Sequence, residues 1–367
     1  MSHLNLTFTK DDFYDWIPIG SGSYSTIYKV FYKKVPKAFS LKVMNKANLR
    51  NTRSSESIKT ECDLVIRLKH TNILRVYSAF EDETSIYFVQ ELGYGNLTDL
   101  DLSSLSFDDL RYYAAELVEA IAYLHQEKIL HRDLKPENVL ICLDQHIKII
   151  DFGCAKLMAE KSIPSVLVPP SESPPLQPRN PSIVGSPLYV SPEVLEGKEA
   201  DQASDIWSLA CMLFYIYTGH PLFSAPTDYL LYQQIIECQY SLTPKKGQTF
   251  HHSLPEELCS LLSQILVKDP TLRLSIDDIK GHPFFEGIDW VHLSYQEPPN
   301  ISSTFSNNVD ASPRTRNVLI LPRDHGSTSR TPIPPPPNES FFPPDSNGDD
   351  TLFCVAWTAP SDVFDAA

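Results

Sequence analysis

Two short segments near the start of the chain combine residue types that suit phosphate binding. Gly20-Ser21-Gly22-Ser23-Tyr24-Ser25 lies between two strand patterns, and its glycines would let the main chain approach a phosphate closely. Lys42 stands in the next strand pattern, where an inward ammonium needs anionic partners such as phosphates and one carboxylate. Glu61, on the following helix pattern, can supply that carboxylate. The alternatives are a glycine-rich hairpin turn and a lysine that extends to solvent.

The most specific segment is His131-Arg132-Asp133-Leu134-Lys135-Pro136-Glu137-Asn138, with Asp151-Phe152-Gly153 after a predicted strand pair. Asp-Phe-Gly alone would mean little, because aspartate and glycine are common in turns. The eight consecutive positions and the interval to the second motif match the protein kinases, so the sequence resembles that family. The resemblance implies phosphoryl transfer from ATP, with Mg²⁺ as the metal cofactor.

The resemblance also assigns roles to individual residues. Asp133 would accept the proton of the substrate hydroxyl, and Asn138 and Asp151 would bind Mg²⁺. Lys135 stands where serine/threonine kinases keep a lysine that neutralises the transferring phosphate. The predicted nucleotide-binding residues are Ile19, Gly20, Ser21, Gly22, Ser23, Tyr24, Ser25, Lys42, Glu61, Glu91 and Gly93, with Gln90 as the gatekeeper.

Three supporting positions also fit this family. Ser191-Pro192-Glu193 stands where kinases have Ala-Pro-Glu, and Arg273 is placed to pair with Glu193. Asp205 opens a helix pattern, and its counterpart in the family braces the main chain of the catalytic loop.

The elements that must position these residues change in type along the chain. The first part of the chain is predicted to form strands at 27–32, 39–44, 73–80 and 86–90. One helix is predicted among them, at 57–69. Ser106 fits a helix N-cap, and a strand pair and more helices follow at 139–142, 147–150, 203–218, 228–238 and 255–266. We expect an α+β bilobal kinase fold, with a β-rich N-lobe containing one main helix and an α-helical C-lobe.

The expected domain boundaries follow from these patterns and from composition. The predicted divisions are an N-terminal segment 1–12, an N-lobe 13–92, a C-lobe 93–290 and a tail 291–367. The activation segment 151–193 includes a proline-rich insertion at 157–181. The tail is acidic and rich in proline, so we expect it to be disordered. Its Pro334–Pro337 run suits SH3-type partners, or it acts as a solvated spacer.

Composition limits the compartment and the partners. The formal net charge is −15, which argues against nucleic-acid binding, because such binding needs a basic surface. Seven cysteines without metal-ligand spacing indicate reduced thiols. The chain begins with polar residues, and its longest apolar stretch, Leu209–Tyr217, is too short to span a bilayer. We therefore expect a soluble cytoplasmic protein.

Within the kinases, the sequence resembles the phosphoinositide-dependent protein kinase of the AGC group. Ser25 replaces the usual third glycine, and similar stretches occur at Ile147–Lys156, Val184–Glu193 and His282–Phe285, with Trp290 beyond. The resemblance implies protein substrates, in particular the activation loops of other AGC kinases. It also implies a self-phosphorylated serine at Ser182, pinned by Arg132 and Lys156.

Two departures from that family bear on its partners. The lipid-binding domain of the family is not present in this sequence, which makes phosphoinositide binding doubtful. Cys62 replaces the arginine that helps the family bind phosphorylated substrate tails. Two alternatives to this reading remain: another serine/threonine kinase branch, such as a calmodulin-dependent type, and a nucleotide-binding pseudokinase scaffold.

Overall fold

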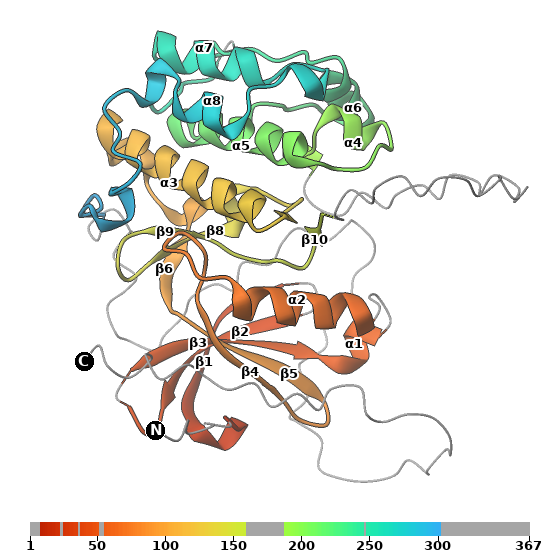
Figure 1. The fold of residues 1–367 in the computed structure, drawn as a ribbon, viewed down its shortest axis with the longest axis vertical. Coiled ribbons are helices and arrows are strands. Elements are labelled where there is room, and N and C mark those ends of the chain that lie inside the picture. The colour runs from red at the N-terminus through yellow and green to blue at the C-terminus, as the bar shows by residue number, and fades with distance from the viewer. Residues whose placement is uncertain are drawn as a thin grey trace, which may run out of the picture. The chain divides into compact units, whose positions relative to one another are not determined.

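The computed structural model describes residues 8–22, 25–35, 37–50, 55–158, 187–245 and 247–301. Internal contacts divide the chain into two units, which are described separately (Figure 1). Of the described residues, the first unit takes those within Met1–Ser57 and Tyr77–Gln90. The second takes those within Ile58–Val76 and Glu91–Ala311.

The first unit is built on a five-stranded sheet with the order β1-β2-β3-β5-β4. Its strands are β1 (Phe13–Ser21), β2 (Ser25–Tyr32), β3 (Ala38–Asn45), β4 (Val76–Glu81) and β5 (Ser85–Gln90). The pairs β1–β2, β2–β3 and β3–β5 are antiparallel, and β-branched and aromatic residues favour this extended conformation. The helix α1 (Lys46–Arg50) follows β3 directly.

An aromatic cluster stabilises this sheet. Phe39 meets Tyr77 edge to face, with ring centroids 5.4 Å apart, and Phe13 stacks on Phe80 at 6.1 Å. Such pairs add about 0.5–1.5 kcal/mol each to the gain from burial. The buried members of the cluster are Phe8, Phe13, Val30, Tyr32, Phe39, Leu41, Tyr77, Tyr87 and Val89.

The second unit is mainly helical and contains α2 (Ser55–Arg67) from Ile58 onward. Its other longer helices are α3 (Phe107–Gln126), α5 (Gln202–Thr218), α6 (Asp228–Ile236) and α7 (Glu256–Ile265). Short helices α4 (Pro192–Leu195) and α8 (Ile276–Lys280) accompany them. A three-stranded sheet has the order β6-β8-β9, and a two-stranded sheet pairs β10 with β7. These strands are β6 (Gly93–Asn96), β7 (Ile129–Leu130), β8 (Val139–Cys142), β9 (Ile147–Ile149) and β10 (Lys156–Leu157).

A strand-rich first unit and a helix-rich second unit confirm the expected α+β class. The order of strands before helices is the one that the sequence patterns predicted, and Ser106 forms the predicted N-cap, accepting from Asp109 N. Leu157, which the sequence placed in the proline-rich insertion, ends strand β10 opposite Ile129. No helix in the described residues is long and apolar enough to cross a membrane.

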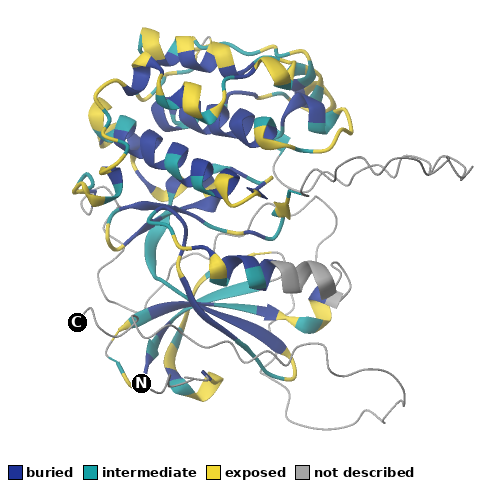
Figure 2. Ribbon diagram, in the orientation of Figure 1, coloured by how far each residue is buried: buried dark blue, intermediate teal, exposed yellow. Residues whose placement is uncertain are grey.

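The helix α5 forms the core of the second unit, and nearly all its residues are buried (Figure 2). Asp201 caps its N-terminus through Ser204 N, and Gly219 ends it in the left-handed region at φ 71°. Trp207 is fully buried against Phe223, with ring centroids 5.9 Å apart. A helix buried on all sides gives its polar residues a fixed position.

The packed part of the second unit continues to Ile301, later than the tail boundary that the sequence suggested. Leu293 and Ile301 are buried, and Ile301 N donates to Gln145 Oε1 at 2.9 Å. Tyr113 Oη donates to Pro299 O at 3.3 Å, so this segment lies against α3 and the β8–β9 turn.

A buried His–Glu pair joins the β8–β9 turn to α3. His146 Nδ1 is hydrogen-bonded to Glu116 Oε1, and Ile147 N donates to Glu116 Oε2 at 3.0 Å. Burial lowers the pKa of His146, but the hydrogen bond and charge of Glu116 outweigh it, with Asp144 also raising it and Lys148 lowering it. The net result is a raised pKa for His146.

This pair predicts a pH-dependent contribution to stability. Because the folded-state pKa of His146 lies above its unfolded value, the contribution is fully present below about pH 6.5 and is lost as pH rises through the folded pKa. Urea unfolding of the wild type and of His146→Gln at pH 6 and pH 8.5 measures it. We expect the wild type to lose more stability over this interval than the variant; equal losses would rule out the charged pair.

Candidate active site

The catalytic loop is held by one buried carboxylate on α5. Asp205 Oδ2 accepts from His131 N at 3.0 Å, and Asp205 Oδ1 accepts from Arg132 N at 2.9 Å. His125 Nε2 lies 3.1 Å from Asp205 Oδ2, and Asp205 itself is 1% exposed. Arg132 has a left-handed main chain with φ 65°, which is unfavourable for a residue with a side chain. The Asp205 bonds therefore hold a strained turn, which agrees with the bracing role that the family resemblance implied for this residue.

Asp133, Lys135 and Asn138 form one hydrogen-bonded set. Lys135 Nζ donates to Asp133 Oδ2 at 2.8 Å, and Asn138 Nδ2 donates to the same oxygen at 2.9 Å. Asn138 Nδ2 also donates to Asp133 O at 2.8 Å. Among the described residues, no donor reaches Asp133 Oδ1. That oxygen is the one able to accept a proton from a substrate hydroxyl.

His131 connects the catalytic loop to the Asp-Phe-Gly motif. Its Nδ1 accepts from Asp133 N at 3.3 Å, so the neutral ring donates through Nε2 to Ile150 O, 3.1 Å away. Its ring also meets the buried Phe152 ring edge to face at 5.2 Å. These contacts fix Asp151, which has φ 64° and an exposed position, beside the catalytic loop.

The oxygen donors of Asn138 and Asp151 fit a Mg²⁺ ion. Asn138 uses its amide nitrogen to bind Asp133, which leaves its Oδ1 turned away for a metal. Asp151 supplies a carboxylate, and Mg²⁺ prefers such oxygens, needing only one or two protein ligands when phosphates complete its shell. No cluster of three or more metal-ligating side chains occurs in the described residues.

The predicted adenine contacts, Glu91 and Gly93, both belong to the second unit, and Gly93 lies against Leu140. A Cβ on Gly93 would lie 2.6 Å from Leu140 Cγ and 2.8 Å from Ile141 O, so only glycine allows β6 to approach β8 this closely. The Glu91 carboxylate accepts from Arg75 N at 2.6 Å, and Glu91 N donates to Arg75 O at 3.1 Å. The main chain at Glu91 is therefore held by Arg75, and that at Gly93 by its contact with Leu140.

The first unit carries the other predicted nucleotide residues. Gly20 pairs with Ile27, Ile27 pairs with Lys42, and Lys42 pairs with Phe88. Directly paired residues share one face of a sheet, so the glycine-rich turn and Lys42 face the same side. Gly22 N donates to Ser25 O at 2.8 Å and closes the hairpin.

The remaining predicted nucleotide residues have different surroundings. Ile19 is exposed and Ser21 pairs with Thr26, whereas Ser23 and Tyr24 lie outside the described residues. Glu61 is buried in the second unit, and its predicted pairing with Lys42 of the first unit stays a prediction.

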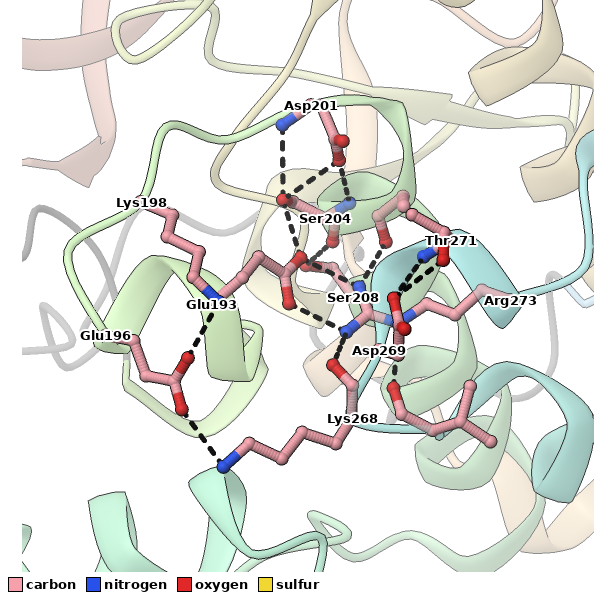
Figure 3. A network of polar contacts seen from close by, with 12 residues as sticks. Glu193, Glu196, Lys198, Asp201, Ser204, Ser208, Lys268, Asp269, Thr271 and Arg273 are labelled. Carbon is pink, nitrogen blue, oxygen red and sulfur yellow. Dashed lines mark hydrogen bonds and ion pairs between the residues drawn. The ribbon is translucent and has the colours of Figure 1, made fainter.

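The predicted Glu193–Arg273 pair is present and buried (Figure 3). Arg273 Nη1 and Nη2 donate to the two oxygens of Glu193 at 2.8 and 2.7 Å, a bidentate geometry. Arg273 Nη1 also donates to Ala203 O, and its guanidinium lies 5.0 Å from the centre of the Trp207 ring. Burial alone would raise the pKa of Glu193, but Arg273 lowers it below the usual value. The pair joins the end of the activation segment to Arg273, and the bonds to Ala203 O and from Ser204 Oγ attach both residues to α5.

The basic residues predicted to receive a phosphate at Ser182 have other partners here. Arg132 Nε donates to Cys154 O at 2.6 Å, and Lys156 Nζ pairs with Glu199 Oε2 at 3.3 Å. Ser182 lies outside the described residues. Phosphorylation at Ser182 therefore stays a prediction.

Sequence patterns did not single out three residues of this site. Leu140 lies beneath Gly93, and this contact depends on strand register. His125 contacts Asp205 from the last turn of α3. Lys148 binds the Glu91 carboxylate, with Nζ 3.3 Å from Oε2. For Lys148 a signal was present, because a lysine between isoleucines in a short strand has to find partners when that strand is buried.

The chain belongs to the protein kinase family. A model of the protein kinase domain matches residues 15–285. Within this family the chain is similar to human 3-phosphoinositide-dependent protein kinase 1, with 34% identity over 296 residues, covering 78% of this chain and 49% of that protein. Human putative 3-phosphoinositide-dependent protein kinase 2 is 33% identical over 338 residues, covering 86% and 80% respectively.

A fungal protein kinase shows the same similarity. The serine/threonine-protein kinase ksg1 of Schizosaccharomyces pombe is 34% identical over 285 residues, covering 77% of this chain and 47% of that protein. The chain thus spans about half the length of two of these three relatives. The expected resemblance to the phosphoinositide-dependent kinases, within the protein kinase family, is confirmed.

The Glu193–Arg273 pair predicts a large stability effect. Arg273→Met would leave the Glu193 carboxylate buried without its cation, and breaking a buried pair in this way costs about 3–5 kcal/mol. Lys268→Met is the matched control, because Lys268 pairs with Glu196 at 3.0 Å on the surface and exposed pairs contribute about 0–1 kcal/mol. Urea unfolding of both variants tests this. Similar losses in the two would contradict the assigned role.

Proposed function

We propose that this chain transfers the γ-phosphate of ATP to serine and threonine hydroxyls of proteins. The observation that carries the proposal is the hydrogen-bonded set of Asp133, Lys135 and Asn138, with one Asp133 oxygen left for the substrate. A pseudokinase scaffold would not need these groups together. ATP and Mg²⁺ follow from the kinase family and from the oxygen donors at Asn138 and Asp151.

In the proposed mechanism the residues position groups and neutralise charge. Asp133 orients the attacking hydroxyl and takes its proton, and Lys135 offsets the charge on the phosphoryl group. Main-chain groups of Glu91 and Gly93 hold the adenine, and Lys42 and the Gly20–Ser25 turn hold the phosphates. Asn138 and Asp151 would hold Mg²⁺, which would neutralise negative charge on the phosphates during transfer.

We propose activation-loop residues of other AGC-type kinases as the substrates. Support comes from the similarity to phosphoinositide-dependent kinases and from Ser25, Val184–Glu193 and Ser182. Another serine/threonine kinase branch is the alternative. The Pro334–Pro337 run is proposed as a ligand for SH3-type domains. The six described cysteines are free, which supports a reducing, cytoplasmic location.

A phosphotransfer assay tests the proposed activity. The full chain with MgATP is incubated with peptides from AGC activation loops and with unrelated serine and threonine peptides. We expect selective labelling of the activation-loop peptides. Asp133→Asn should lower kcat by about 10²–10⁴-fold with little change in ATP affinity, because its contact matters in the transition state. Wild-type turnover by this variant would contradict the proposed role of Asp133.

Mass spectrometry of the recombinant protein tests the proposed modification of Ser182. We expect phosphate at Ser182 in the wild type and none in Asp133→Asn, both made in a host without endogenous protein kinases. A phosphoserine there would add a charge of about −2, and the cationic side chains of Arg132 and Lys156 could bind it. Phosphate on the inactive variant would show that the chain does not modify itself.

A further inference from the structure

The Glu91 side chain is held by a lysine that belongs to a different strand. Lys148 on β9 places Nζ 3.3 Å from Glu91 Oε2. Its other acceptors are Asp144 Oδ2 at 2.9 Å and Thr71 O at 3.0 Å. Lys148 is only 5% exposed, so its ammonium depends on these three acceptors rather than on water.

The charge of Lys148 is maintained by the same contacts. Burial lowers the pKa of Lys148, but Glu91 and Asp144 outweigh burial, and the net pKa is raised. Lys148 therefore remains a cation. Glu91 is enclosed between this cation and Arg75 N, which donates to Glu91 Oε1 at 2.6 Å. Each Glu91 carboxylate oxygen thus has a partner, and the side chain cannot rotate without breaking the bond from Arg75 N or the ion pair with Lys148.

The strand register places Lys148 beside the predicted adenine contacts. β8 and β9 pair with Leu140 opposite Lys148, so the two side chains share a face of the sheet. Leu140 in turn lies against Gly93. Lys148, Glu91, Leu140 and Gly93 therefore form one continuous group in the second unit, and Lys148 is its only described cation.

We propose that Lys148 is a positioning residue for adenine recognition. By holding the Glu91 carboxylate, it fixes the Glu91 main-chain carbonyl that accepts a hydrogen bond from the adenine 6-amino group. Lys148 thereby sets the preference for ATP over purine nucleotides without that amino group. This inference rests on the proposed function, with ATP as the phosphoryl donor.

The test compares Lys148→Met and Lys148→Arg in the full chain, with ATP and with purine riboside 5′-triphosphate, which lacks the 6-amino group. We expect Lys148→Met to raise KM for ATP by about tenfold, with kcat within about twofold of wild type. KM for the analogue should change much less, so the preference for ATP falls. Lys148→Arg keeps the charge and should restore most of the preference.

Two further variants separate this role from general loosening of the fold. Lys280→Met removes another lysine–glutamate pair of the second unit, Lys280 Nζ to Glu119 Oε1 at 2.7 Å, and should leave both KM values unchanged. In Glu91→Gln, adding Lys148→Met should have little further effect, because the pair is already broken.

Three outcomes would overturn the inference: an unchanged preference for ATP in folded Lys148→Met, an equal rise of both KM values, or a change in kcat alone. These outcomes require an active wild type. A wild type that transfers no phosphate from ATP would instead refute the proposed function.

Discussion

The catalytic loop depends on a carboxylate that lies beneath it and takes no part in the chemistry. Asp205 occupies the first turn of the buried helix α5 and accepts hydrogen bonds from two consecutive main-chain N–H groups, those of His131 and Arg132. Charge-assisted bonds of this kind are about twice as strong as neutral ones. They offset the cost of the left-handed Arg132, which is of order 1–3 kcal/mol.

From this fixed turn, a chain of hydrogen bonds positions the polar groups of the site one after another. His131 can accept from Asp133 N and donate to Ile150 O at once only as one neutral tautomer. Asn138 and Lys135 then set the carboxylate of Asp133. Groups fixed before the substrate arrives need no reorganisation during the reaction, which is how preorganised charge lowers a barrier. The second unit alone supplies this whole arrangement.

The sequence predicted the site residues that lie in contiguous motifs. Asp133, Asn138 and Asp151 were found because their order along the chain is itself the signal, and Glu193 and Arg273 because their family counterparts pair. Contacts that depend on strand register were not predictable. Gly93 against Leu140 and Lys148 against Glu91 arise only when β6, β8 and β9 are paired.

The C-terminal limit of the packed region was also difficult to predict from the sequence. Residues 291–301 look like the start of a polar, proline-rich tail, yet Leu293 and Ile301 are buried. Two isolated buried apolar residues give no periodic signal in the sequence. The segment is held by residues from distant parts of the chain: Ile301 N donates to Gln145 Oε1, and Tyr113 Oη donates to Pro299 O. By contrast, the N-cap of α3 at Ser106 and nearly the whole of α5 were predicted, because capping residues and long periodic patterns are local signals.

The most direct measurement is the steady-state kinetics of Asp205→Asn, with Asp201→Asn as the matched control on the same helix. Asparagine cannot accept two main-chain N–H bonds with both side-chain atoms, but it still serves as an N-cap at position 201. We predict that kcat of Asp205→Asn falls by about 100-fold while KM for ATP stays within about twofold, and that Asp201→Asn remains near wild type. A folded Asp205→Asn with wild-type kcat would contradict the account.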